Sequence, residues 1–532
     1  MKKIYTFFFS ILFFSLQAQI SQVKDINPGA ANNSTPTNLF DFNGTLLFRA
    51  TDGLNGIELW KSDGTTNGTV LVKNIEATSS NSNPSNFTLF KGKTYFTAST
   101  GTSITGLELY VTDGTDAGTT LVKDIRVGTG NSNPQNLTVL NTNTLLFAAT
   151  DGVQGVELWK TDGTEAGTVN VIDYTGATGS ISAIVAMKGM AYISQIVSAT
   201  GRELYKSDGT TAGSSLVKDI NPGTGTGMNT EIFVASNNTL YFAGNGGTTG
   251  TELWKSDGTE AGTVLVKEIN PGTANGNPRR FVELKGLIYF NAAGPEGVEL
   301  WRTNGTEAGT TLVTDLNPGI GNSNPDQLEV INGNLYFWAQ EDGTLYNFFK
   351  YDGTTLTRLK EFKAASNTVS TNYILNKGLI YFAADGDGDA QRELWITDGT
   401  PAGTVSVISK LPTGINPKGV NNLTLSNKII YFTASDLDGV ELFKMNPDIL
   451  ANTDRLAIES IVAYPNPVIE ELILNGSFGT KANYTINDVN GRIVSHGVLV
   501  NNKIGTSNLL PGIHVVKIHD GEKQFATKFV KL

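Results

Sequence analysis

The sequence predicts an all-β fold built as a closed ring of about nine four-stranded units, and three observations lead to it. An aromatic residue ahead of an Asp-Gly-Thr-like turn recurs nine times, at spacings of 46 to 50 residues. The ninth copy stops after Lys444, and its missing half stands near the N-terminus, at 23–29. Gly is abundant, with 59 residues, and no long segment repeats with the helical period of 3.6. A period of this length is typical of a β-propeller blade, so we expect a single closed β-propeller.

The nine aromatic residues mark the third strand of each unit. They stand among apolar neighbours rather than in loops, so we interpret them as packing between units and not as stacking platforms for sugars. They are Trp60, Tyr110, Trp159, Tyr205, Trp254, Trp301, Phe349, Trp395 and Phe443.

The fifth unit shows the four expected strands most clearly, at 231–236, 240–243, 252–256 and 264–269. Short runs separated by turn residues such as Asp257-Gly258 fit antiparallel hairpins, because Gly supplies the positive φ that tight turns need. The seventh unit has Asn347 in place of Glu and lacks the second Gly-Thr, a degeneration that we expect one unit to tolerate if its neighbours clamp it.

An open solenoid is the alternative architecture. It would need atypical capping repeats at both ends, whereas here the two ends are complementary fragments of one unit. Closure by the N-terminal strand also leaves no exposed sheet edge, which favours the ring. A unit number of eight or ten stays open.

Composition excludes several functions. The net charge of −11 argues against nucleic acid or an anionic membrane as the partner. The chain has no Cys, so disulfides and thiolate chemistry are excluded. Its three His residues all follow the last repeat, which excludes Ser-His-Asp catalysis and His-bound zinc in the ring. We expect no cofactor.

The chain divides into four segments. A basic start, a short apolar core and Ala18 predict a signal peptide at 1–18, and no other stretch could span a membrane. The propeller is expected at 19–447, followed by a linker at 448–457 and a separate domain at 458–532.

Two carboxylates repeat with the period, and both are expected to be structural. The Glu two residues before the aromatic should accept hydrogen bonds from backbone amides, or pair with a fourth-strand lysine (Lys73, Lys123, Lys218, Lys267), since half-buried carboxylates require partners. The Asp of the Asp-Gly-Thr turn should cap its own hairpin. The glutamates are Glu58, Glu108, Glu157, Glu203, Glu252, Glu299, Glu393 and Glu441, and the aspartates are Asp63, Asp113, Asp162, Asp208, Asp257 and Asp398.

One loop has the alternating carboxylates of a calcium site. Asp385, Asp387 and Asp389 are separated by single Gly residues, and oxygen ligands at this spacing can chelate calcium. The bidentate Glu of a complete EF-hand loop is missing, because that position is Ile396. A solvated acidic turn is the alternative.

The C-terminal segment resembles a known family. It begins with Tyr464-Pro465-Asn466-Pro467, continues with Asp488-x-x-Gly491-Arg492, and ends with a basic strand at 528–532. These motifs resemble the type A C-terminal sorting domain of the type IX (Por) secretion system of Bacteroidetes. Alternating apolar residues fit a small β-sandwich, with the His residues on its surface. The resemblance implies export by the type IX machinery, followed by release or attachment to surface lipopolysaccharide.

The repeats themselves resemble the ELWxxDGTxxGT repeats of surface proteins in the same phylum. We therefore expect a secreted or surface-attached binding and adhesion module whose ligand is a glycan or a surface protein. Variable loops at 98–106, 195–201, 244–250 and 384–392 are the expected binding regions, since loops on a rigid scaffold commonly carry binding.

Two other functions stay open. One is a polysaccharide-degrading enzyme, for which the candidates outside the repeat pattern are Arg279, Arg280, Glu341, Asp342 and Asp387. It would need two carboxylates facing one cavity. The other is a structural component of a surface layer.

Overall fold

The computed structural model describes residues 20–532 apart from 30–31, 78, 101–104, 154, 173–178, 365–371, 411–416, 437–438, 448–457, 477, 480–481, 489–492 and 521–522. The expected signal peptide at 1–18, the linker at 448–457 and the Gly491-Arg492 motif lie outside the described residues. Within them, no helix is long and apolar enough to cross a membrane.

The chain from Gln19 to Asn446 is one compact unit, and its described residues form nine four-stranded sheets. In each of the first eight sheets, four consecutive strands pair in chain order. Sheets 1 to 4 are β2 (Thr37–Phe42), β3 (Thr45–Thr51), β4 (Ile57–Ser62), β5 (Val70–Lys73); β6 (Ser85–Phe90), β7 (Lys93–Ser99), β8 (Leu107–Thr112), β9 (Thr120–Lys123); β10 (Gln135–Asn141), β11 (Thr144–Ala149), β12 (Glu157–Thr161), β13 (Val169–Ile172); β14 (Ser180–Met187), β15 (Met190–Val197), β16 (Gly201–Ser207), β17 (Ser215–Lys218).

Sheets 5 to 8 are β18 (Met228–Val234), β19 (Leu240–Gly244), β20 (Glu252–Ser256), β21 (Val264–Lys267); β22 (Arg279–Leu284), β23 (Leu287–Gly294), β24 (Gly297–Thr303), β25 (Thr311–Thr314); β26 (Asp326–Ile331), β27 (Asn334–Gln340), β28 (Tyr346–Tyr351), β29 (Leu356–Ala364); β30 (Ile374–Asn376), β31 (Leu379–Ala384), β32 (Glu393–Thr397), β33 (Val405–Ser406). A short 3-10 helix, η2 (Val407–Lys410), follows β33. In the fifth unit the third strand has the predicted bounds, whereas the first begins three residues earlier than predicted and the fourth ends two residues sooner.

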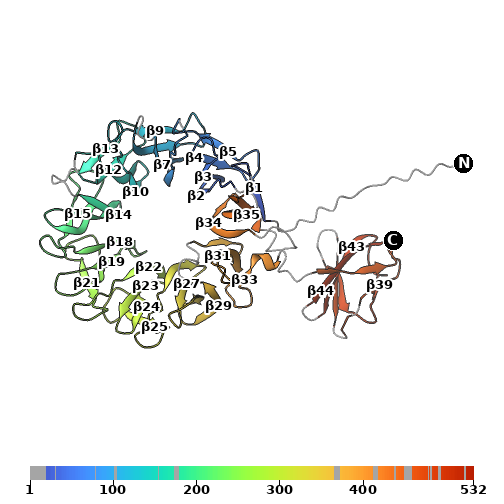
Figure 1. Cartoon of the computed structure of the whole chain (residues 1–532). Helices are drawn as coiled ribbons and strands as arrows, with labels where there is room; N and C mark the ends of the chain where they lie inside the picture. Colours follow the sequence, from blue (N-terminus) through green and yellow to red (C-terminus); the bar gives the residue numbers. More distant parts are fainter. Residues whose placement is uncertain are drawn as a thin grey trace. The chain divides into compact units, whose positions relative to one another are not determined.

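Sheet 9 joins the two ends of this unit. It has the order β1-β36-β35-β34, with β34 (Lys418–Ser426), β35 (Ile429–Asp436), β36 (Gly439–Met445) and the N-terminal β1 (Ile20–Lys24). The antiparallel register places Ile20 opposite Met445 and Gln22 opposite Phe443. The predicted pairing of the N-terminal strand with the incomplete last unit is therefore present, and Figure 1 shows the sheets arranged around a ring.

Contacts between sheets 9 and 1 support the same arrangement. Val23 and Ile26 of the ninth unit share a buried cluster with Phe48 and Trp60 of sheet 1. The ammonium of Lys444 in β36 donates to the carbonyl of Gly64 in sheet 1 at 2.6 Å. The same contact joins Lys61 to Gly114 and Lys160 to Gly209, each time from one sheet to the next. The interface between sheets 9 and 1 is therefore built like the interfaces between consecutive sheets elsewhere in this unit.

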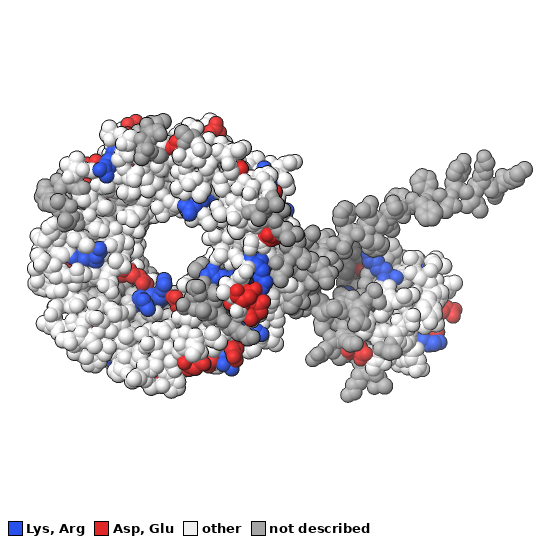
Figure 2. All heavy atoms as spheres, in the orientation of Figure 1, with Lys and Arg blue, Asp and Glu red and all other residues white. Residues whose placement is uncertain are grey.

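The nine repeated aromatic residues are all buried, each at most 9% exposed. Trp159 packs in one cluster with residues of sheets 2 and 3, and Trp254 with residues of sheets 4 and 5. The prediction that these rings pack between units is confirmed. The opening at the centre of the ring is visible in Figure 2.

The seventh unit forms a complete sheet although its sequence departs from the repeat. Sheet 7 has all four strands, and β29 with nine residues is longer than the fourth strand of any other repeat that the structure describes. Asp352 closes a tighter turn by accepting the backbone N–H groups of Thr354 and Thr355, both at 2.8 Å, so the missing second Gly-Thr is not needed. Sheet 8 departs more from the other sheets in strand length, because β30 has three residues and β33 has two.

Residues from Pro447 to Leu532 form a separate compact unit of two sheets. A shared core includes Leu472, Val516 and Phe529, as a sandwich requires. His514 is buried, not on the surface as predicted, because its ring stacks on Phe529 and bonds the Leu510 carbonyl at 2.9 Å. The sheets are β37 (Ile458–Ser460), β44 (Lys523–Lys531), β43 (Gly512–Asp520), β40 (Asn483–Asn487), β41 (Ile493–Val498); and β38 (Val462–Tyr464), β39 (Glu471–Asn475), β42 (Lys503–Gly505).

Candidate functional site

The repeated glutamates are buried acceptors, as predicted. Glu58 accepts the backbone N–H of Ile75 at 2.8 Å and of Ser82 at 3.0 Å, and the Ser82 hydroxyl at 2.6 Å. These donors lie in the segment that leaves sheet 1 and enters sheet 2, so Glu58 fixes the path between the sheets. Backbone donors also reach Glu108, Glu203, Glu252, Glu299 and Glu441.

The alternative partner, a fourth-strand lysine, is wrong for the three lysines whose contacts are described. Lys73 pairs with Asp116, while Lys123 and Lys218 donate to backbone carbonyls at 3.0 and 2.8 Å. In each case the acceptor belongs to the turn of the next sheet. The reason is access: backbone donors already surround the glutamates, whereas the lysines reach outward across the sheet interface.

The aspartates of the Asp-Gly-Thr turns cap those turns, as predicted. Asp63 accepts the backbone N–H of Thr65 at 2.8 Å and its hydroxyl at 2.7 Å, and the Thr65 hydroxyl accepts the N–H of Gly68 at 2.9 Å. A Cβ at Gly68 would lie 2.0 Å from the Asp63 carboxylate, which explains the Gly. The hydrogen bonds to Thr65 lower the pKa of Asp63. Both repeated carboxylates thus serve the scaffold.

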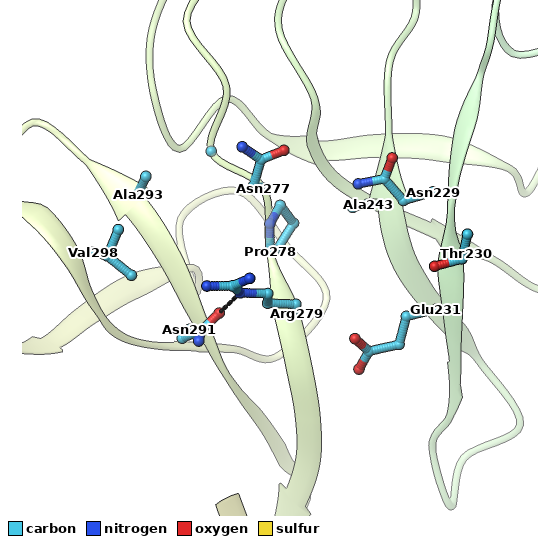
Figure 3. Close-up of a pocket in the computed structure, with 11 residues that line it drawn as sticks. Asn229, Thr230, Glu231, Ala243, Asn277, Pro278, Arg279, Asn291, Ala293 and Val298 are labelled. Atoms are coloured by element: carbon cyan, nitrogen blue, oxygen red, sulfur yellow. Dashed lines mark hydrogen bonds between the residues drawn. The ribbon is translucent and has the colours of Figure 1, made fainter. Parts of the chain in front are cut away.

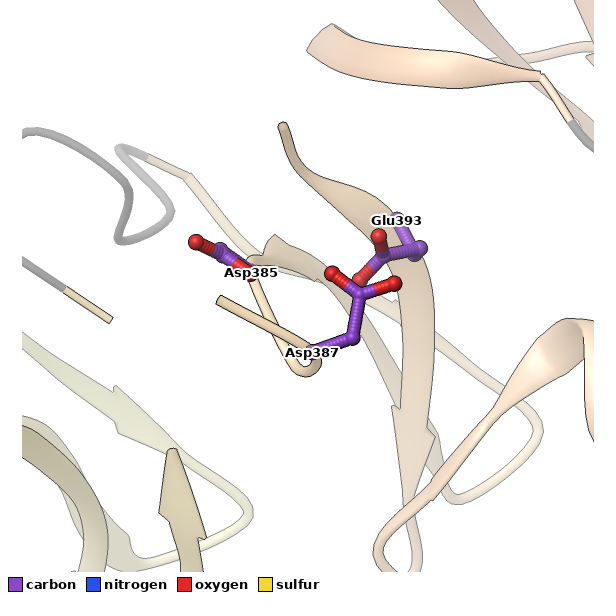
Figure 4. Close-up of side chains that lie close together, drawn as sticks. All are labelled: Asp385, Asp387 and Glu393. Atoms are coloured by element: carbon purple, nitrogen blue, oxygen red, sulfur yellow. The ribbon is translucent and has the colours of Figure 1, made fainter. Parts of the chain in front are cut away.

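A lysine of sheet 9, Lys418 at the start of β34, contacts the acidic loop before β32. Carboxylate oxygens of Asp385, Asp387 and Glu393 lie within 4.8 Å of one another (Figure 4). The Lys418 ammonium contacts Asp387 at 3.1 Å, Asp389 at 3.0 Å and Glu393 at 2.6 Å. Burial lowers the pKa of Lys418, but these hydrogen bonds outweigh burial and raise it above its usual value. A calcium ion among these oxygens would have to displace that ammonium.

Asp385 accepts hydrogen bonds from the backbone of its own loop. Its two oxygens accept the backbone N–H groups of Gly388 at 2.6 Å and Ala390 at 3.0 Å, so it shapes the loop. Of the three predicted calcium ligands, Asp387 and Asp389 share Lys418, and Asp385 bonds the loop backbone. The contacts therefore resemble a closed acidic turn more than an open ligand set.

A pocket of about 360 Å³ lies between sheets 5 and 6 (Figure 3). Sheet 5 contributes the first-strand residues Asn229, Thr230 and Glu231, and sheet 6 contributes Arg279 and Asn291. The linking segment 276–278 and three apolar side chains complete the lining: Ala243, Ala293 and Val298. This combination of a few polar groups with an apolar wall is typical of a small-molecule site.

Arg279 is held in place by an amide. Its Nε donates to Asn291 Oδ1 at 3.3 Å, and the buried Asn291 donates through Nδ2 to the Pro325 carbonyl at 2.7 Å. Figure 3 shows the guanidinium turned toward Asn291 and away from Glu231. A neutral amide positions Arg279 without neutralising its charge.

The neighbouring arginine is neutralised. Arg280 pairs with Asp326 of sheet 7 at 2.9 Å, and its backbone N–H donates to Glu231 of sheet 5 at 2.9 Å. A second hollow of about 120 Å³ lies on this side, and Arg279 and Asn291 line both hollows. The two hollows therefore meet at Arg279 and extend over three sheets.

The remaining enzyme candidates are not brought to this pocket. Glu341 forms an ion pair with Arg358 at 2.7 Å, and the Asp342 carboxylate accepts the backbone N–H of Thr344 at 3.0 Å. Glu231 is the one carboxylate among the described residues that line the larger pocket. Of the off-repeat residues singled out from the sequence, Arg279 lines both hollows and Arg280 lines the smaller one.

Sequence reasoning missed Glu231, Asn229 and Asn291. The expected variable loops do not line the pocket; the first strands and a loop joining two sheets do. Arg279-Arg280 was the available signal, because the corresponding first-strand pairs in several other sheets, such as Thr37-Asn38 and Ser85-Asn86, are uncharged.

One comparison identifies the C-terminal unit. Residues 462–532 match the family model described as a secretion system C-terminal sorting domain. Such a domain directs export by the type IX secretion system, so the protein interacts with that machinery and reaches the cell surface or the extracellular space.

Comparison with solved structures finds distant matches. PorZ, a surface component of the type IX secretion system of Porphyromonas gingivalis, is 13% identical with a TM-score of 0.35, covering 94% of this chain and 75% of that one. The extracellular domain of the one-component system BT4673 from B. thetaiotaomicron is 12% identical with a TM-score of 0.32, covering 93% and 74%. No curated protein matches this chain.

Proposed function

We propose that the nine sheets form a closed β-propeller that acts outside the cell as a binding and adhesion module, with a glycan or a surface protein as its ligand. The sorting domain supplies the export. The ring supplies a rigid frame, because buried clusters and lysine contacts join neighbouring sheets, including sheets 9 and 1. The observation that carries the proposal is the pocket between sheets 5 and 6, with its oriented and un-neutralised Arg279.

Binding is favoured over glycoside cleavage by the state of the carboxylates. Cleavage commonly uses two carboxyl groups that flank the scissile bond. Glu231 accepts backbone N–H groups of Arg280 and Phe281 at 2.9 and 3.3 Å, and Asp326 is paired with Arg280. Both groups are engaged in holding the pocket wall.

A binding and turnover screen tests the proposal. The exported chain would be applied to a glycan array and incubated with a panel of polysaccharides, while released reducing ends are measured. We expect retention on one glycan class without release of reducing ends. Release of reducing ends would replace the proposal with the enzyme, and failure to bind any glycan or surface protein would favour a structural surface-layer role.

A further inference from the structure

We infer that the pocket between sheets 5 and 6 binds a carboxylate-bearing sugar, a uronic acid residue within an oligosaccharide, through Arg279. This inference rests on the proposed binding function and specifies its ligand. Four features of the site support this ligand: the free charge of Arg279, the polarity of the pocket, the local departure from the repeat, and the adjoining hollow.

The first feature is the charge of Arg279. Across the described part of the ring, no carboxylate lies within ion-pair distance of its guanidinium, whereas Arg280 beside it is paired with Asp326. The bond to Asn291 uses Nε, so the two terminal nitrogens remain for a ligand. A guanidinium fork matches the two oxygens of a carboxylate, which makes bidentate recognition the natural use of this side chain.

The second feature is the polarity of the pocket. Arg279 lies toward Asn291, and Glu231 lies on the opposite side, as Figure 3 shows. A ligand that fits must place an anionic group at one end and hydrogen-bond donors at the other. A uronic acid does so with its carboxylate and its hydroxyl groups. Ala293 and Val298 can contact the apolar face of the sugar ring. The Glu231 charge would repel a dianionic phosphate.

The third feature is a local departure from the repeat. In sheets 1 and 2 the second first-strand residue is Asn at positive φ, and its amide donates to the Pro carbonyl of the next sheet: Asn38 to Pro84 at 3.2 Å and Asn86 to Pro134 at 3.4 Å. In sheet 6 Asn291 makes this bond instead, to Pro325 at 2.7 Å.

Because Asn291 makes this bond, the first-strand position in sheet 6 does not need the Asn that makes it in sheets 1 and 2. Arg280 occupies the Asn position at φ +61°, a conformation uncommon for Arg. Strain of this kind is tolerated where the surroundings maintain it, and here Glu231 and Asp326 hold Arg280 from the two flanking sheets. The scaffold thus places an arginine pair where sheets 1 and 2 carry the uncharged pairs Thr37-Asn38 and Ser85-Asn86.

The fourth feature is the adjoining hollow of about 120 Å³, which shares Arg279 and Asn291 with the larger pocket. Its polar lining includes Asn324 and Asp326. A neighbouring sugar of the same chain could occupy it, so the ligand is an oligosaccharide rather than a single sugar.

Titration calorimetry on the exported full chain tests the inference. The probes are trisaccharides of galacturonate, glucuronate and mannuronate, together with their carboxyl-reduced neutral counterparts. We expect at least one acidic trisaccharide to bind ten-fold or more tightly than its neutral counterpart, with affinity falling as salt rises. Arg279→Gln should abolish that preference, and Arg279→Lys should restore it only partly because the fork is lost.

Arg126→Gln is the matched control, because Arg126 is an exposed arginine outside the pocket. It should bind like the wild type, and all variants should keep the wild-type melting temperature. Equal binding of acidic and neutral probes, or an unchanged preference in Arg279→Gln, would overturn the inference and leave a glycan-binding module in place. Absence of binding to every acidic and neutral probe would overturn the inference and remove its support for a glycan ligand; the proposed module would then depend on a surface-protein ligand alone.

Discussion

Burial raises the pKa of three of the repeated glutamates to near neutrality. Glu58, Glu203 and Glu441 are fully buried, and burial raises the pKa of each from its usual 4.5 to about 7, although their hydrogen-bond donors act in the opposite direction. Between these two values the folded chain binds more protons than the unfolded chain. The resulting stability is fully present below pH 4.5 and is lost as the pH rises through 7.

The free energy of unfolding should therefore fall between pH 5 and pH 8. Each pKa unit of difference is worth about 1.4 kcal/mol per group. Hydrogen bonds from threonine lower the pKa values of five turn aspartates, so these titrate below this window: Asp63, Asp113, Asp162, Asp208 and Asp257. Urea unfolding of the full chain at the two pH values measures the difference.

Glu58→Gln tests whether the buried glutamates cause the fall in the free energy of unfolding between pH 5 and pH 8. Gln keeps one oxygen for Ile75 and the Ser82 hydroxyl, but it presents an amide to the backbone N–H of Ser82. We expect lower stability at both pH values and a smaller fall between them. Glu260→Gln, at an exposed turn, is the control and should leave the fall unchanged; an equal fall in all three proteins would contradict the assignment to buried glutamates.

At the scale of one element, the Asp-Gly-Thr turn holds the outer hairpin of a sheet together. The chain contains a natural variant of this turn. Asn304 replaces Asp in sheet 6 and still accepts the backbone N–H of Thr306 at 3.0 Å and its hydroxyl at 2.7 Å. The turn therefore needs the side-chain oxygen and not the negative charge.

Asp63→Ala should destabilise the chain by about 1 kcal/mol, the usual net value of a hydrogen bond, whereas Asp63→Asn should be nearly neutral. Denaturant midpoints measure both, and amide exchange at Thr65 and Gly68 should accelerate in Asp63→Ala alone. Equal losses in the two variants would show that charge, not the acceptor, stabilises the turn.

Features that repeat could be predicted from the sequence. The aromatic packing, the glutamate acceptors and the turn caps each recur at a fixed position, so one physical reason explains many copies. Features that occur once could not. Lys418 is far in sequence from Asp387 and Asp389, and Asn291 acts through a carbonyl of the next sheet. These contacts depend on which residues two different sheets bring together, and a single sequence does not contain that pairing.

The residues of the candidate pocket could likewise be predicted only in part. Arg279 and Arg280 were visible as departures from the repeat, but their different roles were not, because Asp326 and Asn291 decide which guanidinium remains free. The fold was predictable down to strands, including the pairing of the two chain ends. The seventh unit was counted among the nine despite its departure from the consensus, and the shorter turn that Asp352 builds was not predicted.

At the scale of the whole molecule, the pairing of β1 with β36 is the contact that closes the ring. Antiparallel partners lie with their Cα atoms 4.5 to 5.5 Å apart, which is within the range that a disulfide can bridge. Ser21 stands opposite Lys444, and the chain has no Cys of its own. A pair of introduced cysteines can therefore report this contact without interference.

The most direct measurement is disulfide formation in the double variant Ser21→Cys with Lys444→Cys, followed on a non-reducing denaturing gel and by mass spectrometry of the linked peptides. We expect rapid, complete cross-linking within one chain. The control pairs Ser21→Cys with Lys61→Cys, the position in sheet 1 that corresponds to Lys444 but lies opposite Val70, and it should not cross-link. No cross-link in the test pair, or equal cross-linking in the control, would contradict a ring closed by its first strand.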